Sequence, residues 1–290
     1  MPRRSLLGGI LLSAASLVAC DRPAVQGSSS GKDTAVVFIA ASLTNAIRPQ
    51  LDSFAAANGL TLLTESGASM EHVRKLTELH RIPDLILLAD DDVFPKHLAP
   101  NYTTWWADFA RNRMVVAYTD RSKAAKEITQ ANWYRVLTRP GIEVGRADPT
   151  LAPVGYRTLT MFALASLRYG QADLAQRLVA NAPAKNVRSN AAELAALLAA
   201  GELDYIYDYE SVAQAQNFKY LPMPPEIVGR PVTYALAIPI KAPHPESAEK
   251  ILEFFLSDSV RPKLRARFVD MMDRPVVHGT EAPKFLRKSP

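Results

Sequence analysis

Apolar residues along the chain alternate between short β-branched runs and longer stretches with helical spacing. The runs 34–40, 60–65 and 84–88 predict strands, and the stretches 43–57 and 69–80 between them predict helices. Strands that alternate with helices in this way are typical of a largely parallel sheet. We therefore expect the N-terminal part of the folded body to form a β-α-β-α-β unit.

The same alternation returns in the second part of the chain. It predicts, in chain order, strands 114–118 and 142–147, helices 156–169, 171–181 and 189–200, and strand 204–208. A further apolar run, 232–240, is followed by a segment with helical spacing over 248–256. Gly201 stands where a helix C-cap is expected. The whole pattern indicates an α/β protein.

Composition shows no linker between the two sets of elements, since no Gly-, Ser- or Pro-rich stretch separates them. We expect two lobes joined by chain that crosses within strands: residues 33–115 with 236–290 form lobe 1, and residues 116–235 form lobe 2. Such crossings act as a hinge, and a ligand in the cleft gains contacts from both lobes when they close. A single large sheet is the alternative.

The N-terminal residues have the pattern of an export signal. A basic start is followed by an apolar run over residues 6–18, which is too short for a membrane-spanning helix. The sequence LVAC at residues 17–20 resembles the lipobox of bacterial lipoproteins, in which the cysteine becomes a lipid-modified N-terminus. We therefore predict a signal peptide at 1–19, lipidation at Cys20 and a flexible tether over 20–32.

Composition and charge narrow the class of protein further. The chain has 290 residues, 48% of them hydrophobic, which is enough for a large core. Cys20 is the only cysteine, so an intramolecular disulfide is excluded. Removing residues 1–19, with two arginines, lowers the formal net charge from +5 to +3. Because this charge is mild and basic residues alternate with acids, we expect no nucleic-acid partner.

Two serine-bearing turns follow the first two predicted strands. Ser42 stands where it can cap the helix after strand 34–40, and Ser69 repeats the arrangement one β-α unit later. Helix N-termini bind anions, and ligands of open α/β sheets lie at the carboxyl ends of the strands. We therefore expect Ser42 and Ser69 to share an anion site, while a plain N-cap is the alternative for Ser42.

The second part of the chain offers further donors. Backbone amides around Val154 precede one predicted helix, and Val187 precedes another, so several helix N-termini can converge. Arg157 is either a cationic clamp or a surface residue that pairs with Asp148 or Asp173.

Polar side chains are concentrated in the segment 204–211. Its alternation places Tyr205, Tyr207 and Tyr209 on one face and Asp208 on the other. Tyrosine hydroxyls are neutral donors suited to an oxyanion. A carboxylate beside a dianion is repulsive unless it is protonated or bonds the central atom. Packing without ligand contact is the alternative for at least one tyrosine.

Signals for catalysis are weak. His72 and His80 share a predicted helix but lie eight residues apart rather than four, and Ser42 lacks a G-x-S-x-G elbow. The run Asp90-Asp91-Asp92 is expected to be a solvated loop. We expect neither an enzyme nor a cofactor. A periplasmic enzyme with Ser42 as nucleophile or Asp208 as base is the alternative.

Four segments, taken in order, resemble one family. They are AASLTN (40–45), ESGASMEHVRKLTELHRIPDLILLAD (65–90), DPTLAPVGYRT (148–158) and GELDYIYDYESVAQAQ (201–216). Together they resemble the molybdate/tungstate-binding proteins of ABC importers, and most of all the archaeal-type tungstate/molybdate branch.

This resemblance implies a type II periplasmic-binding-protein fold, in which each lobe is a mostly parallel sheet flanked by helices and the ligand lies between the lobes. It implies that five residues donate to the oxyanion: Ser42, Ser69, Val154, Val187 and Tyr209. In the archaeal-type branch two carboxylates also approach the metal atom of the oxyanion, and the resemblance puts Asp208 in one of these roles.

The chain departs from that branch at both carboxylates. It has Asp208 where the branch usually has Glu, and Ala152 where the second carboxylate is expected. The nearest acid, Asp148, comes four residues earlier. Ordinary tetrahedral binding or a different ligand therefore stays open.

We expect a lipoprotein that is anchored to the membrane outside the cytoplasm, acts as a monomer, binds molybdate or tungstate and delivers it to an ABC permease. The alternative ligands are ferric ion, sulfate and phosphate.

Overall fold

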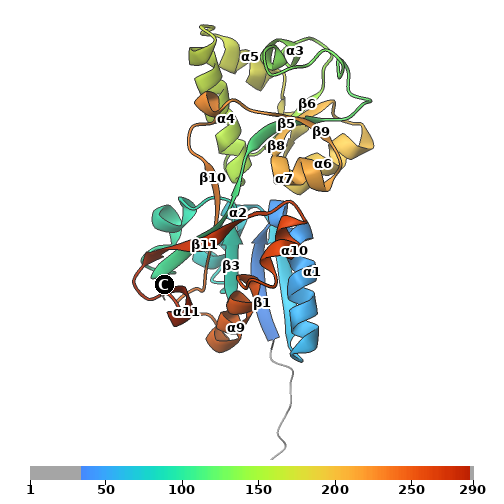
Figure 1. Ribbon diagram of the computed structural model, residues 1–290. Coiled ribbons are helices and arrows are strands. Elements are labelled where there is room, and N and C mark those ends of the chain that lie inside the picture. The colour runs from blue at the N-terminus through green and yellow to red at the C-terminus, as the bar shows by residue number, and fades with distance from the viewer. Residues whose placement is uncertain (1–33, 288–290) are drawn as a thin grey trace, which may run out of the picture. The chain divides into compact units, whose positions relative to one another are not determined.

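The computed structural model describes residues 34–287. The predicted signal peptide, Cys20 and the tether lie outside the described residues. Two sheets with helices against their faces make up this part of the chain (Figure 1). None of its helices is both long enough and apolar enough to span a membrane.

The first sheet has the strand order β11-β4-β10-β3-β1-β2. Its strands are β1 (Thr34–Ala40), β2 (Thr61–Gly67), β3 (Leu85–Leu88), β4 (Trp105–Asn112), β10 (Val232–Ala237) and β11 (Asp270–Gly279). Its helices are α1 (Ala41–Ala57), α2 (Ser69–Thr77), the π-helical turn η1 (Phe94–Leu98), α9 (Pro245–Phe255), α10 (Arg261–Arg265) and α11 (Lys284–Arg287). We call this sheet and its helices the first lobe.

The second sheet has the strand order β7-β6-β8-β5-β9. Its strands are β5 (Met114–Tyr118), β6 (Val144–Ala147), β7 (Val187–Arg188), β8 (Tyr205–Tyr209) and β9 (Lys219–Pro222). Its helices are α3 (Trp133–Val136), α4 (Pro153–Arg168), α5 (Leu174–Ala180), the 3-10 turn η2 (Ala184–Asn186), α6 (Ala191–Ala200), α7 (Glu210–Ala215) and α8 (Pro225–Val228). This is the second lobe.

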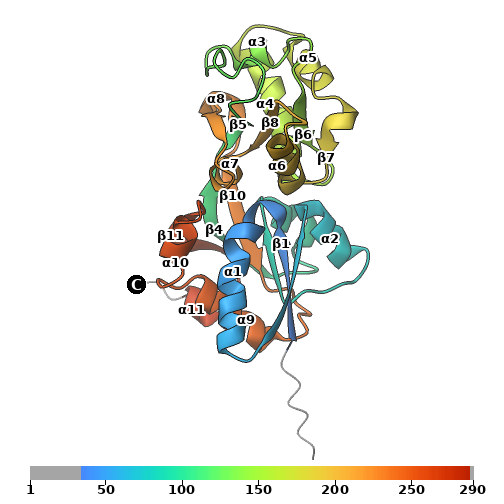
Figure 2. The ribbon, with the colours of Figure 1, turned by 90° about the vertical axis from the view of Figure 1, so that its right-hand side faces the viewer.

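The predicted β-α-β-α-β unit is present. Strand β1 pairs in parallel with both β2 and β3, and α1 and α2 form the two connections. Helix α1 buries Leu43, Ile47 and Leu51, which recur every four residues on one face, and packs beside α9 (Figure 2). This arrangement brings the N-termini of α1 and α2 to the same edge of the sheet.

The chain passes between the sheets within strands. Strand β4 ends at Asn112 in the first sheet and β5 begins at Met114 in the second, with only Arg113 between them. The chain returns from β9 through α8 to β10. The alternative of a single large sheet is therefore wrong for residues 34–287, while the predicted lobe boundaries stay a prediction.

Two expectations about the elements need correction. Both sheets are mixed, because β4, β5 and β10 pair antiparallel with their neighbours on entering or leaving each sheet. Helix α4 begins at Pro153 rather than at residue 156. Proline suits the first helical position, since its φ is already helical and its missing N–H has no partner there. The first turn of α4 therefore starts close to the loop after β6.

Candidate ligand-binding site

The N-termini of α1, α2, α4 and α6 surround one small cavity, to which Tyr209 of β8 also contributes. Its lining comes from both lobes: Ala40, Ala41, Ser42, Gly67, Ala68, Ser69, Ala89, Ala152, Pro153, Val154, Asn190, Ala191 and Tyr209. The structure thus brings together four of the six predicted binding residues, Ser42, Ser69, Val154 and Tyr209. No residue in this lining is charged.

Ser69 is the first residue of α2 and is buried. Its Oγ accepts a hydrogen bond from the backbone N–H of Ala89 at 3.1 Å, which leaves the hydroxyl proton to be donated elsewhere. Glu71 accepts the N–H of Ala68 at 2.8 Å and so fixes the start of the helix. Ser69 is therefore a positioned neutral donor.

Ser42 is the second residue of α1 and not its N-cap, which corrects the prediction. The helix begins directly after β1, so the cap position falls on Ala40, which offers no side-chain hydrogen bond. The Ser42 Oγ instead accepts a hydrogen bond from the Tyr234 hydroxyl at 3.3 Å. Its own proton is again left for another acceptor.

Val154 lies in the first turn of α4, where backbone N–H groups have no partner within the helix. The next residue, Gly155, lets this turn approach the preceding loop closely. A Cβ at Gly155 would lie 2.6 Å from the carbonyl carbon and oxygen of Asp148. The glycine is therefore what allows the α4 N-terminus to reach the cavity.

Tyr209 ends β8 and is 1% exposed. Its hydroxyl has no hydrogen-bond partner among the described residues, although it is buried. Burial raises the pKa of this phenol well above its usual value, against a smaller opposite effect of Arg157. Tyr209 thus brings a protonated hydroxyl to the cavity with no hydrogen-bond partner among the described residues.

Asp208 is fully buried next to Tyr209 but does not line the cavity. Its Oδ1 accepts the N–H of Tyr209 at 2.7 Å, and its Oδ2 has no partner in the part of the chain that the structure describes. Burial raises the pKa of this carboxyl well above its usual value, and the bond from the Tyr209 N–H opposes this. Burial therefore favours the neutral form of the Asp208 carboxyl.

Val187 is not brought to the cavity. It lies in β7, and its N–H donates to the carbonyl of Ala184. The α6 N-terminus is represented instead by Asn190 and Ala191, which the sequence reasoning missed. The sequence contains a pattern that could have identified Asn190, because an Asn three residues before a Glu is typical of a helix N-cap. In the structure Asn190 caps α6 by accepting the N–H of Glu193.

Tyr205 and Tyr207 are also absent from the cavity lining. Tyr205 donates its hydroxyl to the carbonyl of Lys123 at 2.6 Å. Tyr207 is fully buried, and its ring packs edge-on against Trp133 and Phe162, with centroids 6.3 and 4.8 Å away. Two of the three tyrosines therefore serve packing, the alternative that the sequence left open.

Arg157 is buried and pairs with neither Asp148 nor Asp173. Its Nη2 lies 2.9 Å from Oδ2 of Asp90, and the Tyr156 hydroxyl donates to the same oxygen at 2.5 Å. Arg157 belongs to α4 in the second lobe, and Asp90 follows β3 in the first. The arginine therefore connects the lobes beside the cavity and does not line it.

The expectation of a solvated loop at 90–92 is wrong for Asp90, which is 3% exposed. Asp91 accepts from Arg230 at 2.9 Å, and Asp92 also pairs with Arg230. Arg157 and Arg230, which are distant in sequence, neutralise the carboxylates of Asp90, Asp91 and Asp92.

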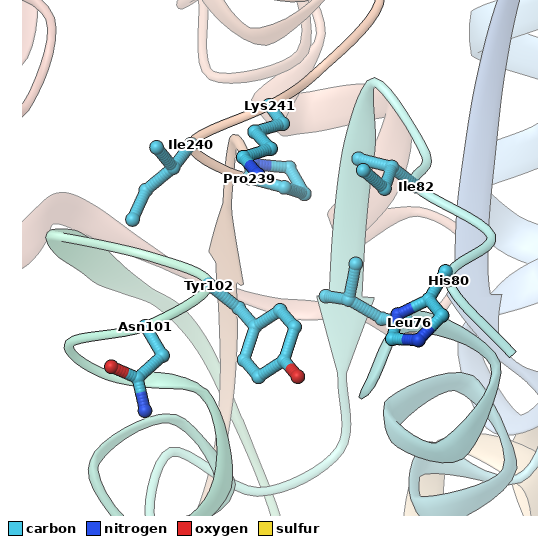
Figure 3. Close-up of a pocket in the computed structure, with 8 residues that line it drawn as sticks. All are labelled: Leu76, His80, Ile82, Asn101, Tyr102, Pro239, Ile240 and Lys241. Carbon is cyan, nitrogen blue, oxygen red and sulfur yellow. The ribbon is translucent and has the colours of Figure 1, made fainter. Parts of the chain in front are cut away.

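A second pocket in the first lobe shares no lining residue with the cavity (Figure 3). It is lined by Leu76, His80, Ile82, Asn101, Tyr102, Pro239, Ile240 and Lys241. The Tyr102 hydroxyl is already donated to the carbonyl of Thr77 at 3.3 Å. This pocket lacks the converging helix N-termini of the cavity.

Residues 35–268 match the family of bacterial extracellular solute-binding proteins. The chain belongs to this family. An uncharacterized solute-binding protein of Petrotoga mobilis is 36% identical over 232 residues, which are 70% of this chain and 72% of that protein. The present chain is also 29% identical to the molybdate/tungstate-binding protein WtpA of Thermococcus kodakarensis, over 94% of this chain and 93% of WtpA.

A solved structure supports the fold. The periplasmic molybdate-binding protein of Azotobacter vinelandii superposes with a TM-score of 0.62 at 14% identity, covering 81% of this chain and 98% of that chain. The predicted periplasmic-binding-protein fold is thereby confirmed. The family is one of solute-binding proteins rather than of enzymes and acts outside the cytoplasm.

Proposed function

We propose that this solute-binding protein binds molybdate or tungstate in the cavity between the α1, α2, α4 and α6 N-termini. We further propose that it delivers the oxyanion to an ABC importer while held to the membrane by a lipid on Cys20. The observation that carries the assignment of an oxyanion is the lining itself, which combines neutral hydroxyl donors with helix N-termini and contains no charged residue.

This lining suits a fully deprotonated tetrahedral oxyanion. The hydroxyls of Ser42 and Ser69 each accept a hydrogen bond from within the protein, so their protons are available, and the buried Tyr209 hydroxyl is unpartnered within residues 34–287. First-turn amides such as that of Val154 add donors and the positive end of a helix dipole. Such a site stabilises a dianion without a counter-charge.

The same lining favours tetrahedral binding over direct bonds from carboxylates to the metal atom. Ala152 lines the cavity where the resemblance implies the second carboxylate, and a methyl group supplies no ligand. Asp208 lies outside the lining. We therefore propose that Asp208 acts behind Tyr209 as a neutral acid rather than as a ligand of the metal atom.

The likeness to the molybdate/tungstate-binding protein WtpA over nearly the whole chain supports the same ligand. The alternative of ferric ion lacks comparable support. Of the tyrosines and the acid that could hold ferric ion, Tyr209 lines the cavity, whereas Tyr207 and Asp208 do not.

Thermal unfolding of the mature chain with added anions tests the proposal. Molybdate or tungstate at about 100 times its Kd is expected to stabilise the fold by about 2.7 kcal/mol, and the midpoint rises further as the ligand concentration increases. Sulfate and phosphate at the same concentrations serve as controls. Stabilisation by phosphate or sulfate but not by molybdate or tungstate would overturn the ligand assignment.

A further inference from the structure

The Ser42 hydroxyl is connected to the place where the chain crosses between the lobes. The Tyr234 hydroxyl, on β10, donates to the Ser42 Oγ at 3.3 Å. The Asn112 side-chain Nδ2 donates to the Tyr234 oxygen at 2.6 Å. Asn112 is the last residue of β4 before the crossing, and Tyr234 is fully buried. Three side chains thus form one hydrogen-bonded series, Asn112 to Tyr234 to Ser42.

The direction of this series is fixed at Asn112. Its Oδ1 accepts two backbone N–H groups, that of Arg113 at 2.8 Å and that of Ser211 at 3.3 Å, which identifies the oxygen. The Nδ2 therefore faces Tyr234 and, with its second proton, the Oγ of Ser211 at 2.7 Å. Because an amide NH2 can only donate, the Tyr234 oxygen accepts and its single proton goes to Ser42.

We propose that Asn112 and Tyr234 are positioning residues that make Ser42 an obligate donor toward the bound oxyanion. The inference rests on the proposed function. Since the Ser42 Oγ accepts from Tyr234, its own proton must point to another acceptor, and Ser42 lines the cavity. Hydrogen bonds in series also strengthen one another, which makes Ser42 a better donor.

Tyr234 stays protonated in this role. Burial raises the pKa of its hydroxyl, while the hydrogen bonds with Ser42, Asn112 and Ser211 oppose this more weakly. The series is therefore neutral and keeps its direction over the physiological pH range.

The arrangement has a consequence for ligand choice. Molybdate presents only acceptor oxygens, so an obligate donor satisfies it. Hydrogen phosphate carries an O–H that needs an acceptor, and a Ser42 held as a donor leaves that group unpaired at a buried site. The series thus favours molybdate over hydrogen phosphate.

The first test is Tyr234→Phe, measured by titration calorimetry with molybdate. The phenyl ring retains the contacts with Tyr209 and Phe109, whose centroids lie 6.0 and 6.2 Å away. We expect the affinity for molybdate to fall about fivefold to tenfold, because Ser42 is then free to rotate its proton away. Ser211→Ala removes the Ser211 hydroxyl beside Asn112 and Tyr234 but keeps the Tyr234 hydroxyl and its bond to Ser42. It is the control, with an expected loss clearly smaller than that in Tyr234→Phe.

The second test reverses the series with Asn112→Asp. One carboxylate oxygen can retain the two backbone N–H donors, but the other accepts the Tyr234 proton, so Ser42 loses its donor. We expect a loss at least as large as in Tyr234→Phe, and a smaller loss for hydrogen phosphate, measured by competition. A variant that merely loosened the site would weaken both ligands alike.

The double variant separates the new charge from the hydrogen-bond series. In the Tyr234→Phe background, Asn112→Asp acts on the ligand only through its charge, so we expect it to cost clearly less affinity than it costs alone. Equal costs in the two backgrounds would overturn the inference. If Asn112→Asp does not fold, unchanged affinity in Tyr234→Phe overturns it alone. A wild-type chain that binds no molybdate would instead refute the proposed function.

Discussion

Ser42 and Ser69 are held by different partners. A backbone N–H, that of Ala89, fixes the Ser69 hydroxyl, whereas a side chain, Tyr234, fixes that of Ser42. Removing either hydroxyl takes the partner from a buried donor. The Ala89 N–H is fixed by the backbone and stays unpaired without Ser69, whereas the Tyr234 hydroxyl can rotate toward another acceptor without Ser42.

This difference leads to a prediction for the two alanine variants. Ser42→Ala and Ser69→Ala should each weaken molybdate binding by about 1–3 kcal/mol, because each removes a donor to a charged ligand. Ser69→Ala should in addition lower the free energy of unfolding by about 1–3 kcal/mol, through the unpaired Ala89 N–H. Calorimetry and urea unfolding of both variants check this, and unchanged affinity in both would remove the serines from the site.

Asp208 gives a prediction on pH. Its pKa in the folded chain lies well above that in the unfolded chain, about 3.9, so between these values the folded state holds more protons. The free energy of unfolding should therefore fall as pH rises above about 4, through this group, and Asp208→Asn should abolish that fall. Urea unfolding of both proteins from about pH 4 to pH 8 measures it. A pH dependence identical in both would show that Asp208 is ionised in the fold.

The same variant reports on the ligand. Asp208 contacts the backbone of Tyr209 and does not line the cavity, so Asp208→Asn should change the affinities for molybdate and tungstate by the same factor. A change in the preference between the two would indicate that residue 208 touches the metal atom.

Among the elements at the cavity, α4 depends on a close approach at one glycine. Gly155 packs against the carbonyl of Asp148, and a methyl group there would overlap the backbone of that loop. The first turn of α4 carries Val154 and Ala152 to the cavity, so this contact positions part of the lining.

Gly155→Ala should move the first turn of α4 away from the loop. We expect a loss of about 1–3 kcal/mol in the free energy of unfolding from overpacking and at least a tenfold loss of molybdate affinity. Ala163→Gly, at an exposed position of α4, is the control: it should cost about 1 kcal/mol of stability with unchanged affinity. Equal loss of affinity in both variants would mean that α4 acts only through stability.

The periodicity of the sequence predicted the helices and strands closely, but it did not predict contacts between segments that are distant in sequence. Strand β1 spans the predicted residues, and α6 begins within two residues of its predicted start. The pairing of Asp90 with Arg157 could not be predicted, since it depends on how β3 meets α4 in space. For the same reason Tyr234 was missed, although Ser42 and Ser69 were identified from the turns that hold them.

At the scale of the whole molecule, the lobes are linked beside the cavity by Asp90, Tyr156 and Arg157. Both charged partners of this ion pair are nearly fully buried, so removing one charge leaves the other without compensation. A ligand in the cavity and this ion pair both favour the conformation in which the lobes meet.

Asp90→Asn should therefore weaken molybdate binding and speed its release, because the closed arrangement is less populated without ligand. We expect a loss of affinity of about tenfold or more, measured with the dissociation rate by stopped flow. Asp92→Asn is the matched control, since its partner Arg230 is half exposed and such pairs contribute little. Equal effects in the two variants would contradict the role of the buried ion pair.

Titration calorimetry of the mature chain with molybdate, tungstate, sulfate, phosphate and ferric ion measures which ligand the protein binds. We expect molybdate or tungstate to bind with one ion per chain, far more tightly than the other three, and Ser42→Ala and Ser69→Ala each to weaken this binding. Tight binding of phosphate, sulfate or ferric ion without binding of molybdate or tungstate would contradict the proposed ligand.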